Sequence, residues 1–94
     1  MATTPTLDSR VAVNDDVLFQ DLHGEGVLLN LKTGVYLGLD VVGARIWQLL
    51  ENHSTLSDIR DALLAEYDVQ EERCGEDLIA LVAEMEKHGL VSLS

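Results

Sequence analysis

Hydrophobic and polar residues alternate along two short runs near the middle of the chain. In the first run, Leu29 and Leu31 alternate with polar residues, and in the second, residues 35–39, every other residue is Val or Leu. Such a period of two is typical of a half-buried strand. The three residues 32–34 between the runs end in glycine, which suits a tight turn. The pattern therefore predicts an antiparallel hairpin.

The hairpin runs directly into a helix. Asp40 follows the second run, and its carboxylate can cap the free N–H groups of a helix that begins at Val41. Apolar residues then recur at spacings of three and four, which indicates one buried stripe with Trp47 at its margin; these residues are Val42, Ile46, Leu49 and Leu50. We expect this stripe to cover the apolar face of the hairpin.

Further strands and helices are predicted on both sides of this unit. Residues 11–13 and 17–22 are strand-like, so residues 17–39 form a meander whose last strand has one partner. Thr55 and Asp58 resemble a capping box at the start of a second helix. A third helix begins near Glu71 and carries the inward stripe Cys74, Leu78, Leu81, Val82 and Met85, with Ile79 at its side. Gly89 suits its C-terminus, and residues 91–93 form a short tail strand.

This order predicts an α+β fold, a winged helix-turn-helix in which a three-stranded antiparallel sheet is followed by three helices. Residues 1–9 are expected to be a disordered N-terminal tail, and residues 10–94 a single domain. A chain of 94 residues has little room for an enclosed catalytic cavity.

Charge and composition narrow the possible partners. The formal net charge is −11, and the six Lys and Arg residues are scattered rather than clustered. Nucleic acid and anionic membranes are therefore not expected partners. The chain has neither a signal peptide pattern nor an apolar run long enough to cross a bilayer, so we expect a cytoplasmic protein.

The sequence contains no convincing catalytic or metal-binding motif. Cys74 is the single cysteine, which excludes an internal disulfide and a paired thiolate site. The three histidines lack metal-ligand spacing, and no pair of nucleophile and base stands out. We expect no enzyme activity, no cofactor and no metal.

Several short motifs together resemble the PqqD-like family, the RiPP recognition elements that bind leader peptides of ribosomally made, post-translationally modified peptides. They extend over nearly the whole chain from Val11 onward, and comprise residues 28–31, Gly34-Val35-Tyr36, Leu39-Asp40, Gly43-Ala44-Arg45-Ile46-Trp47 and residues 85–91. The resemblance implies a binding module that has no chemistry of its own.

The resemblance also implies where the leader peptide binds. An extended leader would add antiparallel to the strand Val35, Tyr36, Leu37, Gly38, Leu39 and Asp40, and its side chains would enter a groove walled by Leu78, Ile79, Val82, Met85 and Glu86. An unpaired strand edge supplies the backbone groups for such pairing, and Gly38 leaves space for a ligand residue. Leu78 and Met85 fit the core slightly better than the groove, whereas Ile79 and Val82 fit the groove at least as well. Tyr36 either covers the sheet or flanks the peptide.

Three functions remain open at this point. The resemblance favours delivery of a precursor peptide to the leader peptidase of a lasso-peptide pathway. A discrete peptide chaperone for a radical-SAM modifying enzyme is the alternative within the family. A winged-helix DNA-binding regulator shares the fold, but the acidic third helix disfavours it.

Overall fold

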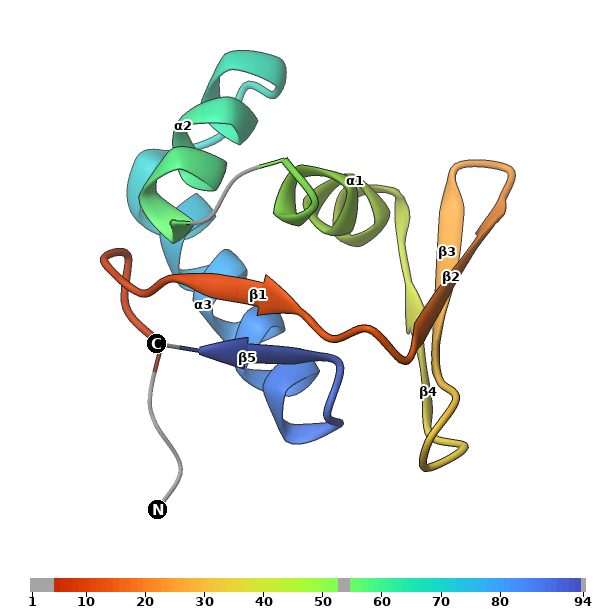
Figure 1. The fold of residues 1–94 in the computed structure, drawn as a ribbon. Helices are drawn as coiled ribbons and strands as arrows, with labels where there is room; N and C mark the ends of the chain where they lie inside the picture. Colours follow the sequence, from red (N-terminus) through yellow and green to blue (C-terminus); the bar gives the residue numbers. More distant parts are fainter. Residues whose placement is uncertain (1–4, 53–54, 94) are drawn as a thin grey trace.

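The computed structural model describes residues 5–52 and 55–93, which form five strands and three helices (Figure 1). In chain order these are β1 (Val11–Val13), β2 (Val17–Leu22), β3 (Glu25–Asn30), β4 (Tyr36–Leu39), α1 (Val41–Leu50), α2 (Leu56–Glu66), α3 (Glu71–Lys87) and β5 (Val91–Leu93).

The main sheet has the order β2-β3-β4, and both of its strand pairs are antiparallel. The sheet stands to one side of the helices, with α1 directly after β4 (Figure 1). The predicted α+β fold, with a three-stranded antiparallel sheet followed by three helices, is confirmed. The winged helix-turn-helix description stays a prediction.

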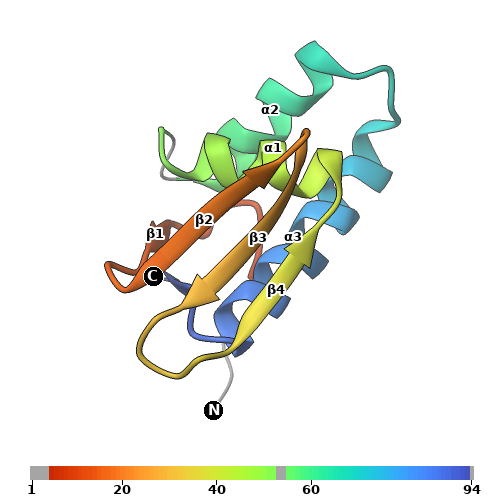
Figure 2. The same cartoon turned by 90° about the vertical axis from the view of Figure 1, so that its right-hand side faces the viewer.

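The two ends of the domain pair with each other in a separate sheet. β1 and β5 are antiparallel, with Val11 opposite Leu93. The sequence predicted both segments but gave no sign that they pair, because their contact joins residues about 80 positions apart. The tail strand β5 therefore pairs within this small sheet, which lies alongside α3 and apart from β4 (Figures 1 and 2).

The segment before β1 caps the second helix. The backbone N–H groups of Leu56 and Ser57 donate to the carbonyl oxygens of Ser9 (3.2 Å) and Leu7 (2.9 Å). Thr55 is the N-cap residue of α2 but makes no side-chain capping bond, so the predicted capping box does not form. Residues 5–9, which we assigned to a disordered tail, are in contact with the domain in this way, whereas residues 1–4 lie outside the described residues.

The strand β3 faces the core with the opposite phase to the one predicted. Leu28 and Asn30 are buried, whereas Leu31 is 62% exposed and lies in the turn beyond the strand. The alternation of Leu29 with Leu31 had suggested that these two leucines face the core. Asn30 faces the core instead, and its burial costs little free energy because its side chain is hydrogen-bonded there.

Asn30 fastens the hairpin to the end of α3. Its side-chain nitrogen Nδ2 donates to the carbonyl oxygens of Gly89 (3.1 Å) and His88 (3.3 Å), and its Oδ1 accepts from the N–H groups of Lys32 and Thr33. Gly89 has the positive φ (71°) predicted for a helix C-terminus. The Asn30 side chain therefore links the turn after α3 to the β3–β4 turn by hydrogen bonds.

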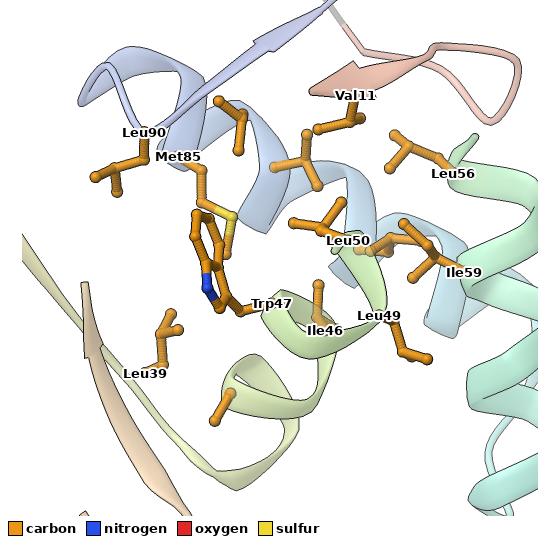
Figure 3. Packing of buried hydrophobic residues seen from close by; sticks show 14 of the residues in the cluster. Val11, Leu39, Ile46, Trp47, Leu49, Leu50, Leu56, Ile59, Met85 and Leu90 are labelled. Atoms are coloured by element: carbon orange, nitrogen blue, oxygen red, sulfur yellow. The ribbon is translucent and has the colours of Figure 1, made fainter. Parts of the chain in front are cut away.

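Helix α1 supplies the centre of the core. Trp47 is 2% exposed, and Figure 3 shows it among Leu39, Met85 and Leu90, which come from β4, α3 and the segment before β5. The predicted cap of this helix is confirmed, because Oδ1 of Asp40 accepts a hydrogen bond from Gly43 N–H at 2.7 Å. Only Asp40 separates β4 from α1, so the capped helix holds the end of the strand against the core.

Candidate functional site

The strand β4 forms an open edge of the main sheet. It pairs with β3 on one side, and among the described residues no strand pairs with its other side. Figure 2 shows β4 as the outermost strand, with α3 running behind it. The strand is one residue shorter at its start than predicted, because Val35 lies in the turn and Tyr36 begins the strand.

The hydrogen-bond pattern of the hairpin shows which backbone groups face outward. Asn30 N–H donates to the Val35 carbonyl at 2.8 Å, which marks residues 30 and 35 as a bonded pair. Bonded pairs alternate along an antiparallel ladder, so Leu37 and Leu39 direct their backbone groups to β3. The N–H and C=O groups of Tyr36 and Gly38 therefore point to the open edge.

The side chains of β4 alternate between two surfaces. Leu39 is buried and Leu37 is half-buried against the core, whereas Tyr36 is 71% exposed. Gly38 is exposed, and a Cβ added to it would meet nothing within 4 Å. Neither contacts nor a positive φ within the domain require glycine at this position.

A hollow of about 640 Å³ lies beside the end of β4, between this strand, α1 and α3. Its lining is mainly apolar, with two carboxylates: Gly38, Leu39, Asp40, Val42, Gly43, Ile46, Val69, Asp77 and Leu81. A second hollow of about 140 Å³ adjoins it and shares Val42, Ile46, Val69 and Asp77. We call the two hollows together the trough.

Of the groove wall predicted on α3, Leu78 lines the trough, and the contact of the other predicted residues with a leader peptide stays a prediction. Leu78, Val82 and Met85 are each 0% exposed, so they belong to the core and offer no side-chain surface except where Leu78 closes the base of the smaller hollow. Ile79 lines a separate hollow with Leu7 and Arg60. The residues of α3 that line the larger hollow are Asp77 and Leu81.

Helical geometry explains this difference. Successive helical residues are rotated by about 100°, so Asp77 and Leu81 lie on one flank of the Leu78 direction, and Ile79 and Glu86 lie on the other. The sequence pattern identified the buried stripe but did not show which flank faces β4. Leu81 was within that stripe, and Asp77, Val42 and Val69 were not recognised as site residues.

Charged groups near the trough are mostly exposed. Arg73 Nε lies 3.9 Å from Asp77 Oδ2, and both side chains are more than two-thirds exposed. The thiol of Cys74, at the wall of the smaller hollow, has a pKa raised chiefly by burial, which keeps it protonated at neutral pH. This thiol is therefore part of an apolar wall rather than a nucleophile.

An ion pair holds the two helices around the trough together. Arg45 on α1 and Glu66 on α2 meet through two hydrogen bonds of 2.7 Å. The hydrogen bond from Arg45 lowers the pKa of Glu66, and the same bond raises the pKa of Arg45. Because both groups are exposed, the pair contributes orientation more than stability.

The outer face of the sheet carries a second apolar surface. Leu18, Gln20, Val27, Leu29 and Tyr36 line a shallow hollow of about 200 Å³ there. This outer face lies on the side of β4 away from the trough, since Tyr36 points away from the core.

In residues 5–52 and 55–93 no group of three or more His, Cys, Asp or Glu side chains is placed to hold a metal ion. His53, one of the three histidines, lies outside this part of the chain. No helix in the same residues is both long and apolar enough to cross a membrane.

These features define a small α+β module with an open strand edge beside an apolar trough. The family model for coenzyme PQQ synthesis protein D (PqqD) matches residues 25–91. The chain belongs to this family as a PqqD-like RiPP recognition element.

Two solved structures are similar to the chain over most of its length. One is TbiB1 in complex with the TbiA(beta) leader peptide, which is 39% identical with a TM-score of 0.79 and covers 85% of this chain and 93% of TbiB1. The other is lasso peptide synthetase B1 complexed with the leader peptide. Its synthetase chain is 25% identical to this chain with a TM-score of 0.76, and the match covers 88% of this chain and 98% of the synthetase chain. None of the curated proteins matches the chain.

Proposed function

We propose that this protein binds the leader peptide of a ribosomally made precursor by accepting it as a fourth strand on β4. The observation that carries this proposal is the unpaired edge of β4 next to the trough. The two similar proteins, which are seen in complex with leader peptides, support it. Strand addition gains affinity from backbone bonds, and pockets for alternate side chains give selectivity.

In this arrangement the leader runs antiparallel to β4, as in the rest of the sheet. Its backbone bonds to the outward groups of Tyr36 and Gly38. Leader side chains opposite Leu37 and Leu39 point to the same face as these leucines and reach the trough. Leader side chains opposite Gly38 point to the outer face, where the missing Cβ gives them room.

On α3 the binding residues are Asp77 and Leu81, with the buried Leu78, Val82 and Met85 supporting them from within the core. Ile79 and Glu86, which the sequence suggested as groove residues, are assigned to the opposite flank of the helix. On β4 the proposed site keeps residues 35–40, the range that the sequence suggested.

A titration with TbiA(beta) leader peptide tests this function. Backbone amide signals of residues 36–40 should shift first, together with those of Asp77 and Leu81. Hydrogen exchange at the Tyr36 and Gly38 amides should slow in the complex, because the added strand accepts their bonds. Saturable shifts confined to β2, or to the surface around Ile79, contradict strand addition to β4.

We further propose that the protein is a non-catalytic partner that delivers the precursor to a leader peptidase in the cytoplasm, where precursor and enzyme are made. One similar protein is named lasso peptide synthetase B1, and this favours a partner peptidase of a lasso-peptide pathway over a radical-SAM modifying enzyme. The outer face of the sheet supports delivery, since it stays open for an enzyme when the edge of β4 is filled. Delivery requires that the protein accelerate precursor cleavage by its peptidase, and an unchanged rate contradicts it.

A DNA-binding role has no supporting observation. The third helix would have to enter the major groove, yet it begins with Glu71 and Glu72 and continues with further acids. Phosphates repel such a surface.

A further inference from the structure

The trough has an acidic end. Asp40, directly after β4, and Asp77, on α3, both line the larger hollow, and both side chains are exposed. Oδ1 of Asp40 accepts the capping bond from Gly43, which holds this carboxylate at the hollow. Among the described residues the carboxylate of Asp77 pairs with Arg73 at 3.9 Å, and this pair is weak because both side chains are largely exposed to water.

The opposite end of the β4 edge has a different charge. Lys32 lies in the turn before β4 and is exposed, so it stands at the Tyr36 end of the strand. Glu84, on the same flank of α3 as Asp77 and Leu81, lies towards this end and pairs with His88 at 3.5 Å, so it offsets the charge of Lys32. A guest strand on this edge therefore meets little net charge at the start of β4 and two carboxylates at its end.

The direction of the guest decides which of its ends meets the carboxylates. β4 runs from Tyr36 to Leu39, so an antiparallel guest has its N-terminal side next to Asp40. The guest residue opposite Leu39 is therefore the first residue of the guest to face the trough, and the residues before it lie at the end of β4 where Asp40 and Asp77 line the larger hollow.

We propose that the leader peptide carries a Lys or Arg just before its paired segment, and that Asp40 and Asp77 hold this cation at the end of the trough. This inference rests on the proposed function and names the chemistry of the peptide: a basic residue followed by a strand with apolar side chains opposite Leu37 and Leu39. The carboxylates also set direction, because a parallel guest would bring that cation to the start of β4, where the net charge is small. The net charge of −11 also attracts a positively charged peptide at long range, which speeds its association with the protein.

A lysine scan of the peptide tests the proposal. The probe is TbiA(beta) leader peptide with its basic residues replaced by Gln, a dye at its C-terminus, and one Lys placed at successive positions. Fluorescence anisotropy gives the dissociation constant of each version, and amide shifts give its register. We expect binding to be tightest, by about two- to five-fold, when Lys is one or two residues before the residue opposite Leu39.

Variants of the protein separate this pairing from general attraction. Asp77→Asn should abolish the gain, and so should Asp40→Asn, because asparagine keeps the helix cap and loses the charge. Glu76→Gln is the matched control, since it removes one charge on the opposite flank of α3 and should preserve the gain. Higher ionic strength should reduce the gain in the unmodified protein.

The outcomes distinguish this inference from the proposed function. Equal affinities along the scan, a maximum at the C-terminal end, or a gain that survives in Asp77→Asn overturns the inference, while shifts at β4 leave strand addition intact. If peptide versions bind without shifting β4 signals, strand addition is overturned and this inference with it.

Discussion

At the scale of residues, α3 shows how one position decides between the core and the site. Leu81 lines the larger hollow and is half-buried, whereas its neighbour Val82 is 0% exposed. Both are aliphatic, and the sequence offered Val82 as a groove residue. The structure separates them by the rotation of a single residue along the helix.

A pair of substitutions at these positions tests the assignment. Leu81→Glu should leave the domain folded and weaken binding of TbiA(beta) leader peptide about ten-fold or more, because a carboxylate beside Asp77 makes the trough polar and more negative. Val82→Glu should unfold the domain, since it buries an unpaired charge. Far-ultraviolet circular dichroism measures folding and anisotropy measures binding. A folded Val82→Glu variant that binds poorly would reverse the two assignments.

At the scale of elements, the edge of β4 is ready for pairing because its outward groups have no partner among the described residues. The strand is short, with four residues, and it ends at the capped turn into α1. Shortness limits unwanted association of the edge with other chains. Backbone pairing by itself distinguishes little between peptide sequences. The adjoining trough adds selectivity, because it accepts only some peptide side chains.

Proline at Gly38 tests strand addition without disturbing the hairpin. Gly38→Pro removes an N–H that points to the open edge, while the bonds of Leu37 and Leu39 to β3 remain. We expect peptide affinity to fall about ten-fold, from one lost hydrogen bond and from the ring that meets the incoming strand. Calorimetry measures the affinity and urea unfolding the stability.

Gly38→Ala is the matched control for this prediction. It keeps the N–H, and its Cβ meets nothing within 4 Å in the free protein. Affinity that falls equally in both variants would show that side-chain volume, not the backbone bond, governs binding at this position.

At the scale of the whole molecule, one carbonyl joins three distant segments. The oxygen of Gly89 accepts hydrogen bonds from the side-chain nitrogens of Asn14 (2.6 Å) and Asn30 (3.1 Å). Asn14 follows β1, Asn30 ends β3, and Gly89 lies just after α3. This junction joins the end of β3 to the C-terminus of α3, at the opposite end of β4 from the larger hollow.

Removal of the Asn30 side chain should loosen this junction. Asn30→Ala removes the side-chain hydrogen bonds with His88, Gly89, Lys32 and Thr33, so we expect the free energy of unfolding to fall by about 1–3 kcal/mol. Urea unfolding measures the change. Asn52→Ala is the control, because Asn52 is exposed and its side-chain hydrogen bond to the Gln48 carbonyl is also exposed. An equal loss in both variants would mean that the junction contributes nothing specific.

The sequence by itself determined most of the local structure. Alternating and helical periods located the hairpin and the helices, Asp40 and Gly89 marked two helix ends, and the short motifs indicated the family. These features depend on neighbours within about four positions, which is the range that a linear pattern records.

Only the tertiary structure decided how these parts meet. The pairing of β1 with β5, the burial of Asn30 in place of Leu31, and the choice of Asp77 and Leu81 as the wall beside β4 all depend on contacts between segments far apart in the chain. A period identifies an apolar face but not its partner. For that reason the edge strand was identifiable from the sequence, whereas the far wall of its trough was not.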